Sequence, residues 1–295
     1  MNILFITDVD LVDSVVFDTH MLAEGLSRAG HKIYAIDCDR YSNRRFTFKT
    51  RETRNIARVY PDARVLLRRP GSLRLVNKRY NPFVIRALEV LSNGFTHYVE
   101  IRKVLKEYDI DVIVQTRVLV SGLQSLYLAR KFNVPIVFRC VDMLHKLMSD
   151  PVSRTVTKAL ERKVYSSVDA ILSMTPKYCE YVEELGADKS KVKLLNFPLD
   201  TELFHPLADC VDIRQKWGLS EKDQVILFVG ALYKFSGLKA FIHQFPEIVR
   251  QAPEAKLLIV GDGPLRPELE QTISNLGLKE RIIITGWEPF ETMPQ

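Results

Sequence analysis

The sequence lacks several features that would indicate a membrane, secreted or metal-binding protein. Its apolar runs are no longer than a β-strand, far below the roughly 20 residues of a membrane-spanning helix. The N-terminus has no basic region of the kind that opens a signal peptide. Cys38, Cys140, Cys179 and Cys210 show no CxxC spacing, which predicts reduced thiols in a cytosolic protein. The six histidines form no HxxxH or His/Cys cluster, so the sequence supports no metal site.

The net charge of +6 is distributed unevenly along the chain. Residues 40–79 contain thirteen basic and two acidic residues, so this segment carries +11 and the rest of the chain −5. We consider two interpretations equally: a solvated, mobile insertion, or a contact with an anionic membrane surface. Interleaved apolar side chains favour the membrane, because they could enter its interface. They are Phe46, Phe48, Leu66, Leu67, Leu73 and Leu75. No nucleic-acid motif accompanies the charge, so we expect no nucleic acid partner.

Apolar β-branched runs that end in glycine alternate with helical patterns at the end of the chain. They are residues 225–230, 256–261 and 281–286. This alternation is typical of parallel βαβ units, whose ligands lie at the carboxyl ends of the strands. The earlier sequence repeats it, with strands expected at 2–7, 32–37, 112–115, 135–140, 170–174 and 192–195, and helices at 16–29, 83–108, 120–132, 153–166 and 176–185. Residues 83–108 are expected to form either one long helix or a pair of helices broken near Asn93 and Gly94.

We therefore predict an α/β protein with two Rossmann-like, doubly wound domains. The first domain is expected to cover residues 1–205, a linker residues 206–223, and an incomplete second domain residues 224–295. The pair Asp8 and Asp10 follows the first strand, and we favour a strand-end turn over a metal-binding role for it.

Three segments of the second domain resemble the donor half of the retaining nucleotide-sugar glycosyltransferases of family 4, which have the GT-B fold. They are Phe228–Leu238, Ala255–Leu265 and Leu276–Gly286. The family's domain junction is similar to Lys191–Asn196 with Leu199–Phe204 and Pro206. Its first helix and the start of its second strand are similar to Leu22–His31, and the strand before the junction is similar to Val168–Ser173. The resemblance covers the whole chain except the basic segment.

The resemblance implies a hexosyltransferase that moves a sugar from a nucleotide diphosphate sugar to an acceptor, with retention and without a metal or other cofactor. The resemblance does not identify the acceptor. The basic segment favours a membrane-associated acceptor, lipid-linked or a polysaccharide, and a cytoplasmic protein at the inner face of the cell membrane. The implied donor-binding residues are Gly230, Lys234, Ser236, Gly237, Gly261, Asp262, Gly263, Trp287 and Glu288. Glycines let the backbone approach a ligand, and helix N-termini bind phosphate.

The sequence departs from the family in the diphosphate loop. The family has Arg and Lys where this chain has Ala231 and Ser236. Lys234 is the cation that could replace them, and Lys239 in the following helix is a weaker candidate. A cation is needed there because charge develops on the departing diphosphate.

In the first domain, Asp142 matches the acid that the family places near the transferred sugar, and we assign it as catalytic. The implied acceptor-binding residues are Asp18, His20, Arg139 and His145. For Asp142, a helix cap or a salt bridge is as good an explanation as a functional role. For His20 we favour core packing or capping.

The family's paired glutamates, which hold the sugar and ribose, lie beyond the third donor-domain strand. We therefore expect this chain to be truncated, with the intact enzyme continuing past Gln295. Strand 281–285 should then expose apolar surface and promote self-association. The alternatives are a nucleotide-sugar epimerase of the same fold and a non-catalytic fragment. A dinucleotide dehydrogenase is disfavoured, because Arg266 stands where the fingerprint requires a third glycine.

Overall fold

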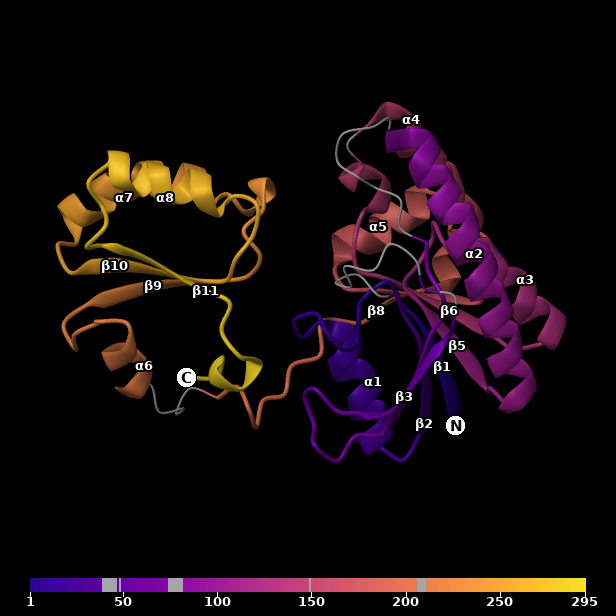
Figure 1. The fold of residues 1–295 in the computed structure, drawn as a ribbon. Helices are drawn as coiled ribbons and strands as arrows, with labels where there is room; N and C mark the ends of the chain where they lie inside the picture. The colour runs from indigo at the N-terminus through magenta and orange to yellow at the C-terminus, as the bar shows by residue number, and fades with distance from the viewer. Residues whose placement is uncertain (39–46, 48, 74–81, 149, 206–210) are drawn as a thin grey trace. The chain divides into compact units, whose positions relative to one another are not determined.

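The computed structural model describes residues 1–38, 47, 49–73, 82–148, 150–205 and 211–295. The chain divides into two compact units, Met1–Leu199 and Asp200–Gln295 (Figure 1). We predicted a first domain that ran to residue 205 and a linker over 206–223. The division comes slightly earlier, and the short helix α6 (Val211–Lys216) is part of the second unit.

The first unit is built on an eight-stranded sheet with the order β3-β4-β2-β1-β5-β6-β7-β8. All neighbouring strands are parallel except β3 and β4, which are antiparallel. The strands are β1 Asn2–Ile6, β2 Lys32–Ile36, β3 Arg51–Ile56, β4 Val65–Arg69, β5 Val112–Gln115, β6 Ile136–Cys140, β7 Ala170–Ser173 and β8 Val192–Leu194. The six strands predicted for this unit are confirmed to within a residue or two.

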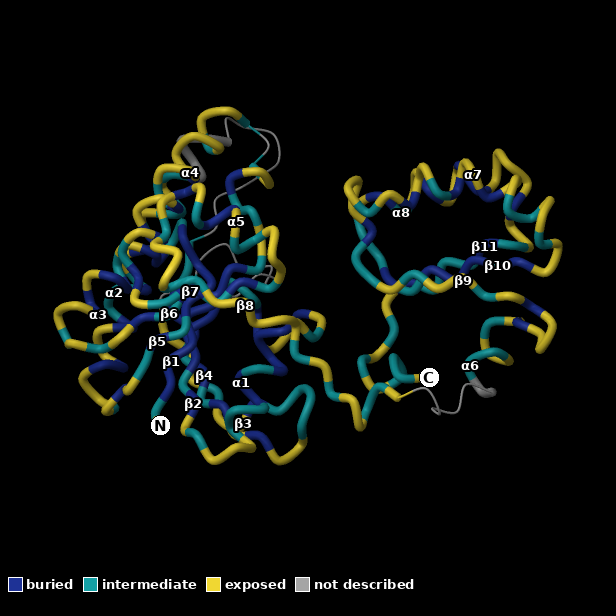
Figure 2. Tube along the Cα trace, turned by 180° about the vertical axis from the view of Figure 1, so that it is seen from behind, coloured by how far each residue is buried: buried dark blue, intermediate teal, exposed yellow. Residues whose placement is uncertain are grey.

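Helices cover both faces of this sheet (Figure 1). They are α1 Asp18–Arg28, α2 Pro82–Glu107, α3 Gly122–Phe132, α4 Pro151–Tyr165 and α5 Pro176–Glu184, with short 3-10 turns η1 Leu144–Leu147 and η2 Lys189–Lys191. In β1, Leu4 and Ile6 face the core under α2 to α5, whereas Ile3 and Phe5 face the core under α1. Because successive strand residues point to opposite faces, a strand that is apolar throughout is buried on both sides. Figure 2 shows this buried centre in dark blue.

Of the two alternatives for residues 83–108, one long helix is confirmed and a broken pair is wrong, because α2 is continuous from Pro82 to Glu107. Gly94 lies where α2 meets the start of α3, and a Cβ there would be 2.9 Å from the carbonyl oxygen of Val120. The Asn93 side chain accepts a hydrogen bond from the Leu73 amide at 2.8 Å. Both residues therefore serve tertiary contacts on a regular helix.

The basic segment is not a solvated insertion where the structure describes it. Residues 51–69 form β3 and β4, and β4 pairs with β2 inside the sheet. Val65, Leu67 and Arg69 are buried, because they alternate along β4 toward the interior. Leu67 is therefore unavailable to a membrane, contrary to the membrane interpretation. Phe46, Phe48 and Leu75, which that interpretation also used, lie outside the described residues.

The second unit contains a parallel three-stranded sheet with the order β11-β10-β9. Its elements are β9 Gln224–Val229, α7 Leu238–Gln251, β10 Ala255–Val260, α8 Arg266–Asn275 and β11 Ile282–Gly286, with 3-10 turns η3 Lys234–Ser236 and η4 Phe290–Thr292. One core cluster joins α7 and α8 to one face of the sheet. The three predicted strands are confirmed, and they alternate with helices as expected.

Among the strands of this unit, β9 exposes more apolar surface than β11, the strand for which we predicted it. Leu227 and Val229 are 59% and 55% exposed, and β9 appears largely yellow and teal in Figure 2. In β11, Ile282 is 4% exposed, because Ile282 and Ile284 pack into the core under α7 and α8. Within the described part of the chain, no helix combines the length and apolar character needed to cross a bilayer.

Candidate functional site

Glycines at the three strand ends of the second unit allow close backbone-to-backbone contacts between the loops. Gly261 has φ +141°, and a Cβ there would lie 2.0 Å from the carbonyl oxygen of Gly230. A Cβ on Gly263 would lie 2.7 Å from the carbonyl oxygen of Leu232. The Gly230 amide donates to Val260 at 3.0 Å, and the Gly261 amide donates to the Gly286 oxygen at 2.8 Å. No side chain fits these contacts, so the glycines bring the strand ends together.

The loop after β9 presents a cation beside the start of α7. Lys234 lies in η3 and is exposed, and it makes no ion pair with any acid that the structure describes. Gly237 follows with φ +76°, and the Ser236 hydroxyl accepts a hydrogen bond from the Leu238 amide at 3.4 Å. Lys239 is instead paired with Glu268. Of the two lysines considered, Lys234 is therefore the one whose charge remains available at the helix start.

Arg266 is a second cation at this edge, and the sequence analysis did not assign it to the site. Its Nη1 is 2.9 Å from Asp262 and its Nε is 2.7 Å from Glu270. These two contacts raise the pKa of Arg266. The same Nη1 would be 3.1 Å from a Cβ on Gly286, so the guanidinium reaches the end of β11. Arg266 could have been assigned to the site from the sequence, because it begins the helix that follows the glycine turn ending at Gly263.

Asp262 of the predicted donor set is held by its own turn. Its Oδ1 accepts the Gly263 amide at 2.7 Å, which is the main reason that the pKa of Asp262 is lowered. Beyond β11, Trp287 is 54% exposed. Glu288 is bound to Lys216 of α6 at 2.7 Å. The indole is thus open to a ligand, whereas the Glu288 carboxylate already has a partner. The donor-binding roles of these residues stay predictions.

In the first unit, three carboxylates gather at the carboxyl edge of the sheet. Asp142 follows β6, and the residue as a whole is exposed to solvent. Its pKa is raised, first by partial loss of water around the carboxyl group and then by the charges of Asp8 and Asp18. Asp8 follows β1 and accepts a hydrogen bond from Thr116, which follows β5, at 3.4 Å. The loop after β1 and the start of α1 therefore place negative charge near the predicted catalytic Asp142.

Asp18 and Arg139 form a buried ion pair. Asp18 is the first residue of α1, and its Oδ2 is 2.7 Å from Nε of Arg139 in β6. Arg139 is 1% exposed, and among the described atoms its Nη1 and Nη2 have no hydrogen-bond partner. This pair fixes the start of α1 on the strand that leads to Asp142. Acceptor binding by either residue stays a prediction.

The two histidines of the predicted acceptor site are buried. His20 accepts the Phe17 amide at Nδ1 at 3.0 Å, which caps α1 as we favoured. Burial, together with the charge of Arg58, lowers the pKa of His20 to about 4. His145 is 2.7 Å from Glu161 and 2.9 Å from the Tyr181 hydroxyl. Both rings thus have structural contacts, and their acceptor-binding roles stay predictions.

The Asp10 side chain stabilises the loop after β1, as expected of a strand-end turn. It accepts hydrogen bonds from the amides of Val12 and Asp13 at 3.1 and 2.9 Å. Arg69 at the end of β4 binds both Asp10 and Asp37 at 2.6 Å. Among the described residues, no group of three or more His, Cys, Asp or Glu side chains is arranged to hold a metal ion.

Two family models match the chain. Residues 15–197 match the glycosyl transferase 4-like domain, and residues 211–295 match glycosyl transferases group 1. The chain belongs to the glycosyl transferase 4-like family. The first match ends at residue 197 and the second begins at residue 211, so the boundary between the two units, at residues 199 and 200, lies between them.

The chain is similar in sequence to curated proteins whose names indicate transfer of a sugar. It is 24% identical over 212 residues to alpha-monoglucosyldiacylglycerol synthase of Streptococcus pneumoniae, covering 68% of this chain and 46% of the relative. It is 34% identical over 196 residues to alpha-D-kanosaminyltransferase of Streptomyces kanamyceticus, covering 59% of this chain and 48% of the relative. The chain thus spans about half the length of the curated relatives it matches.

Solved structures support the fold of this family member. Sucrose-phosphate synthase from Thermosynechococcus elongatus matches with a TM-score of 0.73 at 16% identity, over 99% of this chain and 72% of that chain. HepE from Anabaena, in complex with UDP and glucose, matches with a TM-score of 0.64 at 14% identity, over 98% and 70% of the two chains. The predicted GT-B class of α/β fold, with two Rossmann-like units, is confirmed.

Proposed function

We propose that this protein transfers a sugar from a nucleotide diphosphate sugar to an acceptor, with retention of configuration and without a metal. The observation that carries the proposal is the edge of the second unit, where interlocked glycine turns, Lys234 and the start of α7 come together. Membership of the glycosyl transferase 4-like family supports it. A structural neighbour that binds UDP and glucose supports a nucleotide-sugar donor.

Lys234 and the amides at the start of α7 would hold the donor diphosphate. The first turn of a helix has backbone amides without intrahelical partners, and its dipole favours an anion. Lys234 adds a full positive charge to them. When the sugar leaves, negative charge builds on the diphosphate, and these groups would stabilise it. Arg266 and Trp287 flank the end of β11, where the nucleoside would contact a guanidinium and an exposed ring.

The transfer step would occur on one face of the sugar. The acceptor oxygen forms a bond to the anomeric carbon on the face from which the nucleotide diphosphate departs, and the acceptor proton passes to the departing phosphate oxygen. No protein nucleophile is required. Asp142 would accept a hydrogen bond from a hydroxyl of the transferred sugar. Loss of water around the carboxyl group, and then the charges of Asp8 and Asp18, raise the pKa of Asp142, so it also holds a proton more readily than an isolated aspartate.

We propose that the acceptor is lipid-linked or a polysaccharide. We also propose that this protein acts in the cytoplasm or at the inner face of the membrane. The name of the pneumococcal relative supports a lipid acceptor. A membrane contact would not involve Val65, Leu67 or Arg69, because they are buried in the sheet. Partition of the radiolabelled product between butanol and water separates the two acceptor classes.

The test is incubation of the chain with radiolabelled UDP-glucose, GDP-mannose and other sugar nucleotides, with a lipid extract or a polysaccharide as acceptor. We expect label in a larger product whose new linkage has the anomeric configuration of the donor, at full rate in excess chelator. Calorimetry should give binding of the matching nucleoside diphosphate. An inverted linkage, activity that requires added metal, or epimerised sugar without acceptor would each contradict the proposal.

A further inference from the structure

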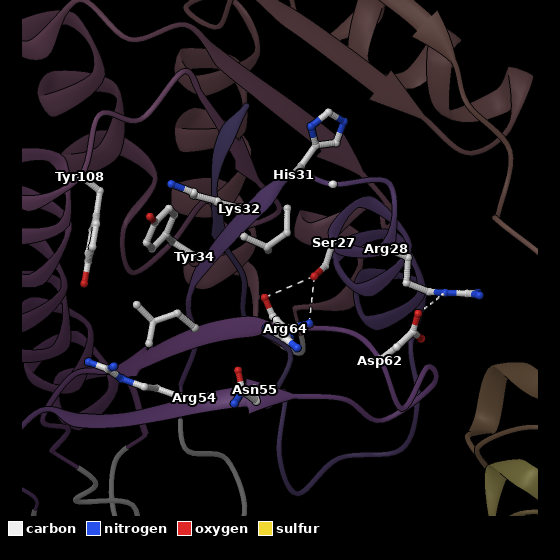
Figure 3. Close-up of a pocket in the computed structure, with 13 residues that line it drawn as sticks. Ser27, Arg28, His31, Lys32, Tyr34, Arg54, Asn55, Asp62, Arg64 and Tyr108 are labelled. Atoms are coloured by element: carbon white, nitrogen blue, oxygen red, sulfur yellow. Dashed lines mark hydrogen bonds and ion pairs between the residues drawn. The ribbon is translucent and has the colours of Figure 1, made fainter.

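A pocket in the first unit opens at the sheet edge opposite the candidate catalytic loops (Figure 3). Its volume is about 640 Å³. It is lined by the end of α1, the first residues of β2 and the hairpin of β3 and β4. Lys32 begins β2, whereas the loops that carry Asp8 and Asp142 follow the other ends of parallel strands. A five-residue strand spans roughly 16 Å, so the pocket is separate from that edge.

The charge in the pocket is strongly positive. Four cationic side chains line it, Arg28, Lys32, Arg54 and Arg64, against one carboxylate, Asp62. Arg28 binds Asp62 at 3.2 Å, and Arg54 binds Glu52 outside the lining at 2.9 Å.

Two of the four cations have no counter-charge. Lys32 and Arg64 are exposed, and neither forms an ion pair within the described part of the chain. Like charges that share a pocket repel one another, so an anion bound between them would be favoured.

The backbone around Arg64 is fixed, so its side chain extends from a defined position. The Ser27 hydroxyl accepts the Arg64 amide at 2.9 Å and donates to the Arg64 carbonyl at 3.3 Å. Opposite it, Asn55 has φ +57° at an irregularity of β3 between Thr53 and Ile56. Asparagine tolerates this left-handed conformation better than most residues. Figure 3 shows Arg64 and Asn55 between the Arg28 end and the tyrosine end of the pocket.

An aromatic wall closes the other end of the pocket. The rings of Tyr34 and Tyr108 have centroids 4.2 Å apart, and both residues are half-buried. Lys32 lies beside this wall in Figure 3. The pocket therefore combines unneutralised cations with an apolar ring surface. Its volume falls in the usual range for small-molecule sites and exceeds that of a bare phosphate ion.

We propose that this pocket binds an organic phosphate ester through Lys32 and Arg64, as a site separate from the donor edge of the second unit. Guanidinium and ammonium groups are the side chains that bind phosphate most strongly, and a guanidinium can do so with two parallel hydrogen bonds. The tyrosine wall contacts the organic part of the ligand. A free sugar phosphate and a phospholipid headgroup both supply this chemistry. The site does not depend on the proposed glycosyl transfer.

The test is calorimetry of the chain with glucose 6-phosphate, and co-sedimentation with phosphatidylglycerol and phosphatidylcholine vesicles, all without donor. The double variant Lys32→Gln/Arg64→Gln should weaken binding about tenfold or more. The matched control Arg162→Gln/Lys163→Gln removes the same charges from exposed positions on α4 and should bind as the native chain does. Asn55→Asp, which adds a carboxylate to the pocket without removing a cation, should also weaken binding.

The two arms identify the source of the phosphate. Binding of glucose 6-phosphate that Lys32→Gln/Arg64→Gln abolishes assigns a soluble ligand. Sedimentation with phosphatidylglycerol vesicles alone, lost in the same variant, assigns a headgroup. The proposal is overturned if neither probe binds, if glucose binds as well as its phosphate, or if the α4 control loses binding equally.

Discussion

Replacing Arg69 by methionine should destabilise the first unit strongly. Arg69 is 4% exposed, and its guanidinium binds Asp37 through Nε at 2.9 Å and through Nη2 at 2.6 Å. The same Nη2 binds Asp10 at 2.6 Å, and both aspartate side chains are fully buried. Methionine keeps the apolar stem but removes the charge. Breaking a buried ion pair by removing one partner costs about 3–5 kcal/mol, because a charge is left buried without its counter-charge.

The positions of the tryptophans allow this loss to be assigned to one unit. Trp217 and Trp287 are the two tryptophans of the chain, and both belong to the second unit. Urea unfolding followed by tryptophan fluorescence therefore reports the second unit, whereas far-ultraviolet circular dichroism reports both. We expect Arg69→Met to shift part of the dichroism transition to lower urea and to leave the fluorescence transition unchanged. A loss of 3–5 kcal/mol is a large part of the roughly 5–15 kcal/mol that stabilises a typical domain.

Two further variants control this experiment. Arg64→Met removes an exposed cation from the same strand region and should change the stability by less than about 0.5 kcal/mol. Adding Asp37→Asn to Arg69→Met should recover part of the loss, because one unpaired charge is removed with its partner. If Arg69→Met unfolds at the same urea concentration as Arg64→Met, the network contributes nothing to stability and the reasoning fails.

The same variant should show a defined pH dependence. Burial raises the pKa of Asp37 even with Arg69 present, and Arg69 opposes that rise. Without Arg69 the folded pKa rises further above the unfolded value of about 3.9. A carboxyl group with a raised folded pKa stabilises the protein below its unfolded pKa, and that stability is lost as the pH rises through the folded pKa. The deficit of Arg69→Met relative to the native chain should therefore shrink as the pH falls from neutral.

Three predictions concern the second unit. Lys234→Ala should weaken nucleoside diphosphate binding about ten- to hundredfold in calorimetry and leave binding of the nucleoside unchanged; equal affinity for the diphosphate would make Lys234 a surface residue only. Leu227→Thr/Val229→Thr should reduce self-association in sedimentation velocity, since it removes apolar area from an open strand. Gly261→Ala should lower the thermal midpoint more than Gly277→Ala does; both have positive φ, but a Cβ on Gly277 meets no atom within 4 Å.

Much of the fold followed from local patterns in the sequence. Continuous apolar β-branched runs, glycine at strand ends and helical periodicity predicted every strand of the second unit, because parallel strands are usually apolar on both faces. Composition alone left two points open. Asn93 and Gly94 are common in turns, which made a broken helix as plausible as a continuous one, but here they serve contacts between α2 and its neighbours. The charge over 40–79 hid the alternation of Val65, Leu67 and Arg69, which marks a half-buried strand.

The candidate site was less predictable, because its partners are distant in the sequence. Loops after strands could be assigned to an edge, and Asp142 is at the edge where the pattern placed it. Its neighbourhood could not be assigned. Arg139 meets Asp18 across 121 residues, and Lys216 meets Glu288 across 72. Such pairs depend on how strands are ordered in the sheet, and no local period encodes that order.

From the sequence, the glycines at the strand ends could serve either close backbone packing or the binding of a ligand by their amides. The structure distinguishes these two explanations. Gly261 and Gly263 are required because strand-end loops touch backbone to backbone, with no room for a Cβ. The amides of Gly230 and Gly261 are used in those same contacts and are not directed at a ligand. The glycines therefore define the shape of the edge, and we expect an anion there to be recognised by Lys234 and the first amides of α7. A family match carried by glycines can thus persist in a chain whose phosphate-binding side chains have changed.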